Sequence, residues 1–248
     1  MLQSKDINQR PWLIDLNTID STNNYATRLL QDGMAHSGLV VYTSHQFAGK
    51  GQRGKQWNTV PGDAIAMSLI YCPTGDCDIF RLSFAVPVVV RKVLQNLMPE
   101  CQVCIKWPND IYVNNCKLSG ILIENTFRGS VIKSSVIGIG INMRQQDFEK
   151  MDRSPISVRM ITGEYYDHLE IVDDMRNSLL SILEENNANV LSEYQKFLWR
   201  KGVYSKFKDL RSNEIFEGVI KGVNATFELE IQTANALLTY QFGTVQFI

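Results

Sequence analysis

The sequence predicts an α+β protein with a small β module at its C-terminal end. Apolar runs rich in β-branched residues predict strands at intervals up to about residue 200. Two segments, 79–98 and 171–198, carry apolar residues at helical spacing. From about Gly202 the pattern changes to short strands separated by turn residues. We therefore expect two domains, residues 1–200 and residues 201–248.

The first elements follow one another closely. Trp12–Leu16 is a short strand-like segment, and Ser21 lies in a polar cluster whose residues are common helix caps. Apolar residues then recur at helical spacing until Gly33, which ends the predicted helix. Two strands are predicted next, Leu39–Thr43 and Ala64–Tyr71.

The later elements are longer. Ile79–Met98 is predicted to be helical, with Pro87 either near the helix start or at a kink. Val131–Asn142 is an apolar strand, and the helical pattern of Ile171–Leu198 should break near Asn186–Asn189. Five short strands are predicted in the C-terminal module: Phe207–Leu210, Ile215–Val223, Phe227–Gln232, Leu237–Phe242 and Val245–Ile248.

The stretch from Ile105 to Glu124 predicts a strand, a break at Pro108 and a hairpin. The hairpin turn is Asn114-Asn115, because asparagine tolerates the left-handed backbone of a two-residue turn. Gly120 interrupts the second strand, where a glycine often marks the close approach of a ligand or another backbone. Four polar residues lie on this frame and can converge: Lys106, Asn109, Asp110 and Lys117. A hairpin with solvated charges is the alternative interpretation.

Composition limits the function classes. Of the 248 residues, 44% are hydrophobic and 21% charged, which is typical of a globular protein with a sizeable core. The net charge of −1 gives no electrostatic argument for binding nucleic acid or an anionic membrane. The sequence shows neither a signal segment nor a membrane-spanning run, so we expect a cytoplasmic protein.

The cysteines and histidines do not have the spacing of a metal site or of a catalytic triad. The five cysteines fit reduced thiols. Cys101 and Cys104 have the spacing of half a zinc site, but no second pair is suitably placed. The three histidines lie in no recognisable triad motif. We therefore expect no metal ligated by protein side chains.

A basic, glycine-rich segment spans residues 45–57, HQFAGKGQRGKQW. Its glycines would let the backbone approach an anion, and its Lys and Arg residues would neutralise phosphate. A solvated flexible loop is the default alternative. Gly49–Gly54 also matches GxGxxG formally, but a loop rather than a helical pattern follows, so a dinucleotide-binding turn is not expected.

Together these motifs resemble the biotin protein ligases. KWPND followed by KLSGILIE resembles their catalytic core, and Ser-Thr-Asn at 21–23 resembles their ligand-binding triplet. The loop at 45–57 resembles GRGRxGRxW, although Lys50, Gln52 and Lys55 replace arginines common in that motif. GIGIN at 138–142 resembles G-x-G-I-N. The resemblance implies a class II synthetase-like catalytic domain with a mixed sheet and packed helices, followed by an SH3-like domain.

The resemblance also implies roles for individual residues. Lys117 would bridge the biotin carboxylate and the α-phosphate of ATP, and Arg53 would hold phosphate. Asp110 would orient or deprotonate the incoming lysine, or else act as a structural carboxylate. The implied biotin-binding residues are Ser21, Thr22, Asn23, Gln46, Lys50, Gly51, Gln52, Lys117 and Gly120. The implied ATP-binding residues are Lys50, Arg53, Lys55, Trp57, Lys106, Asn109, Lys117 and Asn142.

The implied activity is ATP-dependent biotin–[acetyl-CoA-carboxylase] ligation, with Mg²⁺ carried by the ATP phosphates. The implied partner is a biotin carboxyl carrier protein, and a homodimer is allowed. About twenty residues precede Ser21, too few for a DNA-binding domain, so we expect no repressor function and no binding of DNA or membrane. Two alternatives stay open: a lipoate ligase or octanoyltransferase of related fold, and a biotin sensor without catalytic activity.

Overall fold

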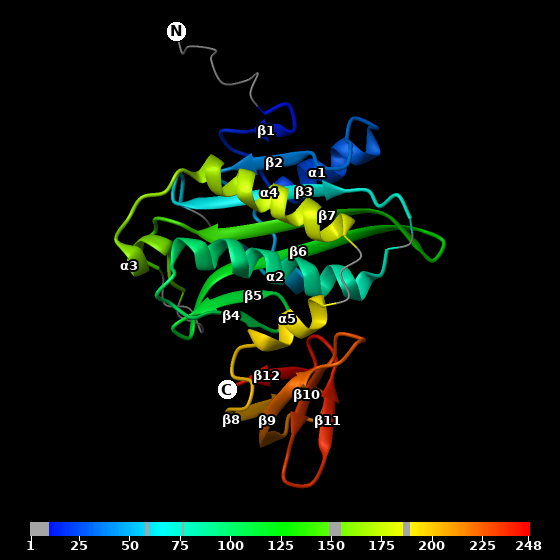
Figure 1. Cartoon of the computed structure of the whole chain (residues 1–248), viewed down its shortest axis with the longest axis vertical. Coiled ribbons are helices and arrows are strands. Elements are labelled where there is room, and N and C mark those ends of the chain that lie inside the picture. Colours follow the sequence, from blue (N-terminus) through cyan, green and yellow to red (C-terminus); the bar gives the residue numbers. More distant parts are fainter. Residues whose placement is uncertain (1–9, 58–59, 76, 149–154, 186–188) are drawn as a thin grey trace.

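A seven-stranded mixed sheet forms the centre of the protein (Figure 1), whose computed structural model describes residues 10–57, 60–75, 77–148, 155–185 and 189–248. The strand order is β1-β2-β3-β7-β6-β5-β4. β1 runs parallel to β2, and the other neighbouring pairs are antiparallel. The strands are β1 (Leu13–Asp15), β2 (Val40–Thr43), β3 (Ala64–Tyr71), β4 (Val103–Lys106), β5 (Asp110–Val113), β6 (Cys116–Arg128) and β7 (Val131–Asn142).

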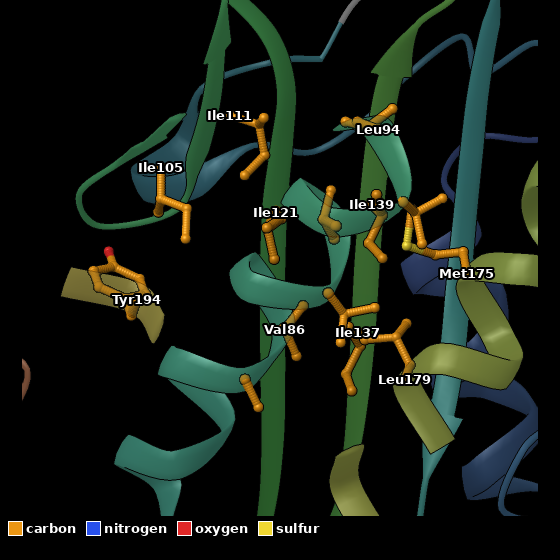
Figure 2. Close-up of a cluster of buried hydrophobic side chains, with 14 of the residues drawn as sticks. Val86, Leu94, Ile105, Ile111, Ile121, Ile137, Ile139, Met175, Leu179 and Tyr194 are labelled. Carbon is orange, nitrogen blue, oxygen red and sulfur yellow. The ribbon is translucent and has the colours of Figure 1, made fainter. Parts of the chain in front are cut away.

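Helices cover both faces of this sheet. The helices are α1 (Thr22–Gln31), the 3-10 turn η1 (Gln52–Gly54), α2 (Ile79–Leu97), α3 (Val158–Thr162), α4 (His168–Glu184) and α5 (Val190–Lys196). α2 and α4 pack on one face over the largest apolar cluster, where Val86, Ile139 and Leu179 lie together (Figure 2). α1 packs on the opposite face over a smaller cluster that includes Ala26 and Val41. The predicted α+β class is therefore confirmed.

Helix α2 continues through its proline. Asp78 caps the helix by accepting a hydrogen bond from the backbone N–H of Phe80 at 2.9 Å. Pro87 lies inside the helix. Of the two positions considered from the sequence, the one near the helix start is therefore excluded. The Pro87 ring is buried with the apolar side chains around it, so burial of the helix face offsets the lost backbone hydrogen bond.

The later predicted turns and breaks are confirmed. Asn114 and Asn115 adopt φ angles of 51° and 63°, the left-handed backbone that a two-residue hairpin turn requires. α4 ends at Glu184 and α5 begins at Val190, on either side of the predicted break; residues 186–188 of that break lie outside the described residues.

A second, five-stranded antiparallel sheet follows, in the order β11-β10-β9-β8-β12. Its strands are β8 (Tyr204–Asp209), β9 (Ile215–Val223), β10 (Leu229–Gln232), β11 (Leu237–Tyr240) and β12 (Val245–Phe247). The predicted β module is thus confirmed, and it agrees with an SH3-like fold. β10 begins later than predicted because Phe227 lies in a turn with a φ of 65°. The division into 1–200 and 201–248 stays a prediction.

The C-terminal module packs against helices α2 and α5 and against the segment after β4 through aromatic side chains. The Phe227 ring lies 4.9 Å from Phe84 of α2 and 5.8 Å from Tyr194 of α5, measured between ring centroids. The indole N–H of Trp107 donates to the Phe227 carbonyl at 3.1 Å. Because Trp107 directly follows β4, this contact ties the second sheet to the KWPND segment.

His168, at the start of α4, should make stability depend on pH. It is buried, and its Nδ1 lies 3.0 Å from the Tyr42 hydroxyl. Burial, assisted by the charge of Arg144 and opposed by that of Asp167, lowers the pKa of His168 to about 4. Between pH 6.5 and about 4, the unfolded chain therefore binds a proton that the folded protein does not. The free energy of unfolding should fall as the pH falls through this window, by roughly 3 kcal/mol at most.

Denaturant titrations across this pH window measure the effect. His168→Gln should flatten the pH dependence. An equal slope in wild type and His168→Gln would contradict the assignment.

None of the helices in the described part of the chain combines the length and the apolar character that crossing a membrane would need.

Candidate active site

A cavity lies over one face of the large sheet, between the start of α1, the glycine-rich loop and strands β3, β6 and β7. Its lining residues include all nine predicted for biotin. The full lining is Ser21, Thr22, Asn23, Gln46, Lys50, Gly51, Gln52, Trp57, Ala66, Met67, Asn109, Lys117, Gly120, Ile121, Leu122, Gly138, Ile139 and Gly140.

Polar side chains gather at the end of the cavity formed by α1. Ser21 caps this helix, with its hydroxyl oxygen 3.5 Å from the Asn24 backbone N–H. Gln46 Oε1 accepts a hydrogen bond from the Thr22 backbone N–H at 2.7 Å. The helix cap and the cavity wall are therefore the same residues, so both interpretations of the Ser-Thr-Asn triplet are compatible.

The glycine-rich loop is anchored beside α1. The backbone N–H groups of Phe47 and Ala48 donate to the carbonyls of Ile19 and Asp20, at 3.1 and 3.0 Å. Further along, Trp57 N–H donates to the Gly49 carbonyl at 2.8 Å, which folds the loop back on itself. The loop therefore closes one side of the cavity.

The three loop glycines have different roles. A Cβ atom at Gly49 would lie 2.3 Å from the Trp57 carbonyl oxygen, which is closer than real Cβ contacts. Gly54 has a φ of +76°, where other residues are strained. At Gly51 the nearest atom to an added Cβ would be 3.2 Å away, at the Lys55 carbonyl.

Gly49→Ala should therefore raise KM for the cavity ligand about 10²-fold, because it displaces the loop by an ångström or more. Gly51→Ala is the matched control and should change KM far less. Steady-state kinetics of both variants measures this difference. Equal KM values would show that the close contact at Gly49 is not required.

The indole ring of Trp57 lies on the surface of the sheet, over Gly120 of β6 and Gly140 of β7. A Cβ added at Gly140 would be 2.4 Å from its indole, and one added at Gly120 would be 3.1 Å away. The glycines of β6 and β7 thus make room for a flat ring. Trp57 Nε1 and Gln52 Oε1 are buried and have no hydrogen-bond partner among the described residues. Buried polar atoms at a cavity wall are suited to bonds with a ligand.

Lys117 is held in the cavity by Asp110. Its Nζ lies 2.6 Å from Asp110 Oδ1 and 5.6 Å from the centroid of the Trp57 ring. The two residues come from neighbouring strands, β6 and β5, so rigid backbone sets the distance between them. Asp110 therefore positions Lys117, in agreement with its interpretation as a structural carboxylate. Asn109 lines the cavity as predicted, and its Nδ2 donates to the Ile121 carbonyl at 2.6 Å.

Two predicted ATP-binding residues do not line the cavity because their side chains are engaged elsewhere. The Asn142 amide donates to the carbonyls of Lys117 and Ile156, at 3.3 and 3.1 Å. Lys106 is buried, 3.2 Å from the Tyr112 hydroxyl, with its ammonium among three aromatic rings. These rings belong to Tyr112, Trp199 and Phe247, whose centroids are 4.8, 5.5 and 5.2 Å away.

Arg53 and Lys55 also lie outside the cavity wall. Both are exposed. Arg53 has a φ of 55°, which directs its side chain toward the second sheet. There it donates to the Gly243 carbonyl at 2.8 Å and lies 5.7 Å from the Phe242 ring. The phosphate contact expected of Arg53 stays a prediction.

Ser68 and Glu124 contribute to the polar end but were not predicted. Ser68 Oγ lies 2.6 Å from Asn23 Oδ1, and Asn23 Nδ2 donates to Glu124 Oε2 at 2.7 Å. A serine inside an apolar strand at 64–71 was the available signal, since a buried hydroxyl requires a partner. Glu124 ends KLSGILIE but gave no separate signal.

The described residues contain no group of three or more His, Cys, Asp or Glu side chains placed to hold a metal ion.

Residues 16–142, which include every residue of the cavity lining, match the model of the Biotin/lipoate A/B protein ligase family. The chain is 36% identical to the bifunctional ligase/repressor BirA of Salmonella typhimurium, over 93% of this chain and 70% of that protein. It is 36% identical to the BirA of Escherichia coli, over 73% of this chain. That alignment spans 57% of the Escherichia coli protein, less than two thirds of its length.

Among solved structures, the biotin protein ligase from Aquifex aeolicus in complex with biotin and ATP is similar to this chain, with a TM-score of 0.78. The match covers 95% of this chain and 98% of that one at 21% identity, so it shows a shared fold. The sequence matches extend the relationship beyond the fold, because the family model spans more than half of the chain. This protein is a member of the biotin/lipoate A/B protein ligase family.

Proposed function

We propose that the protein is an ATP-dependent biotin–protein ligase. It would convert biotin to biotinoyl-5′-AMP and transfer the biotinyl group to a lysine of a biotin carboxyl carrier protein. The observation that carries the proposal is that all nine residues expected to bind biotin, Lys117 among them, line one cavity. The relatives named as biotin ligases support the choice of biotin.

Neither step of the proposed reaction requires a nucleophile on the enzyme. What the first step requires is a positive charge held at a fixed place beside the reacting groups. In the first step a biotin carboxylate oxygen would attack the α-phosphorus of ATP, and pyrophosphate would leave. In the second step the acceptor lysine amine would attack the carboxyl carbon, and AMP would leave. Lys117 would stabilise the negative charge that develops in the first step, because its ammonium is fixed by Asp110 in the cavity. Trp57 would provide an aromatic surface for the nucleotide.

The remaining expectations follow from this proposal. Mg²⁺ would be bound mainly by the phosphates of ATP and by water. The acceptor would be a biotin carboxyl carrier domain, as the relative named biotin–[acetyl-CoA-carboxylase] ligase in Paracoccus denitrificans suggests. A homodimer is allowed by the proposal, and lack of DNA binding and a cytoplasmic location belong to it as well. Light scattering and gel-shift assays with and without biotin would test the first two.

The direct test is incubation with ATP, Mg²⁺, biotin and a biotin carboxyl carrier domain, followed by intact mass measurement of the acceptor. We expect an acceptor heavier by one biotinyl group. Labelling with lipoate but not biotin would favour a lipoate ligase. Binding of biotin without pyrophosphate exchange or labelling would favour a sensor.

Gln52 should shorten the time for which the enzyme retains biotinoyl-AMP. It lines the cavity where related loops carry an arginine, and Arg53 bonds to Gly243 instead of compensating. Charge-assisted hydrogen bonds to phosphate are roughly twice as strong as neutral ones. Gln52→Arg should therefore slow the release of preloaded, labelled adenylate and lower the labelling of bystander proteins. Release at the wild-type rate or faster would show that another residue holds the intermediate.

A further inference from the structure

The polar end of the cavity contains a hydrogen-bond network centred on Asn23. Its side chain is 4% exposed and lies directly on strand β7 at Gly138. Three groups surround its amide: Ser68 Oγ at 2.6 Å from Oδ1, and Glu124 Oε2 and the Leu122 carbonyl at 2.7 and 3.4 Å from Nδ2.

The chemistry of these neighbours fixes which way the amide faces. A carboxylate and a carbonyl oxygen only accept hydrogen bonds, so the side facing Glu124 and Leu122 must be the NH₂ group. Turning the amide would place Oδ1 against two acceptors and would leave the Ser68 hydroxyl facing a donor. Oδ1 therefore faces Ser68, and of its two lone pairs the serine uses one.

The protons of the neighbouring hydroxyls follow from this orientation. The Ser68 hydroxyl has one proton to donate. Its oxygen lies 2.6 Å from Asn23 Oδ1 and 2.8 Å from Thr22 Oγ1. Since Oδ1 cannot donate, the Ser68 proton goes to Asn23. Thr22 can then donate to Ser68 Oγ or to Gln46 Oε1, which is 3.1 Å away. With either choice, Thr22 Oγ1 and Asn23 Oδ1 both retain acceptor capacity toward the cavity.

We propose that Ser68 and Glu124 act as positioning residues that hold Asn23 as an acceptor and so select a ligand with N–H donors. This inference rests on the proposed function and deepens it. A cyclic urea has two N–H donors and one carbonyl acceptor, and Ser21 has a hydroxyl proton not used by its cap contact. A dithiolane ring has no such donors and would leave the acceptors unpaired. The network therefore separates the two ligand classes in the family's name.

Glu124 offers a test that does not endanger the fold, because its side chain is exposed although it contacts the buried amide. Glu124→Gln keeps an acceptor for Asn23 Nδ2. Glu124→Lys presents only donors, which favour the turned amide. Ser68→Ala removes the hydroxyl from the other side of the amide.

Calorimetry should give biotin dissociation constants about 10–100-fold higher for Glu124→Lys and Ser68→Ala than for wild type. Glu124→Gln should stay within about threefold of wild type, because it preserves the acceptor. KM for ATP should not change in any variant. The preference for biotin over lipoate should shrink in Glu124→Lys and Ser68→Ala, which a merely structural role would not produce.

Equal biotin affinity of Glu124→Gln and Glu124→Lys would overturn the inference, as would parallel losses of biotin and ATP binding in Ser68→Ala. A wild-type protein that does not bind biotin would instead overturn the proposed function. Wild-type binding with unaffected variants would overturn the role of the network alone.

Discussion

Lys117→Ala should lower biotin-dependent pyrophosphate exchange by about 10²–10³-fold. The variant removes the ammonium that Asp110 holds at 2.6 Å in the cavity, and no water molecule replaces a fixed cation there at equal strength. The melting temperature should change little, since Lys117 is on the cavity surface and its strand pairs on both sides.

Lys133→Ala is the matched control for this experiment. Lys133 is an exposed lysine on β7 of the same sheet and does not line the cavity. Its variant should exchange pyrophosphate at the wild-type rate. A Lys117→Ala enzyme with wild-type exchange would remove Lys117 from the mechanism.

Gly138→Ala should lower kcat/KM for biotin by about 10²-fold. The added Cβ would be 2.2 Å from Asn23 Oδ1, so the amide must move away from the sheet. A displacement of about 1 Å at a positioning group is enough for a loss of this size. Steady-state kinetics with biotin as the varied substrate measures it.

Gly75→Ala is the control for the added methyl group, because no atom lies within 4 Å of a Cβ there. If Gly138→Ala retained wild-type kcat/KM, the position of Asn23 over β7 would not matter for catalysis.

Features set by local chemistry were predicted from the sequence. Asn114-Asn115 specified its turn because few residues tolerate a left-handed backbone. Gly138 and Gly140 lie in the predicted strand at 131–142, and the structure shows which side chains pack on them, Asn23 and Trp57. The sequence could not identify those partners, because strand alternation says which face a residue occupies and not what packs on it.

Two residues expected to bind ATP make contacts that the sequence did not predict. Arg53 and Lys106 were interpreted within their own motifs, whereas Gly243 and Phe247 of the second sheet lie beside them. Those contacts join segments more than a hundred positions apart, and no periodicity encodes them. The resemblance implied a contact with ATP for both residues, and a backbone carbonyl and aromatic rings are further partners of a cation.

The aromatic surroundings of Lys106 also set an order of events during synthesis. Phe247, on β12, supplies one of the three rings around this ammonium, and β12 pairs with β8. A ribosome adds about 5–20 residues per second, so Phe247 is made roughly 7–28 s after Lys106. During that interval Lys106, which precedes the β5–β6 hairpin, lacks part of its apolar shell. The aromatic surroundings of Lys106, at the end of β4, are therefore complete only after β12 has been made.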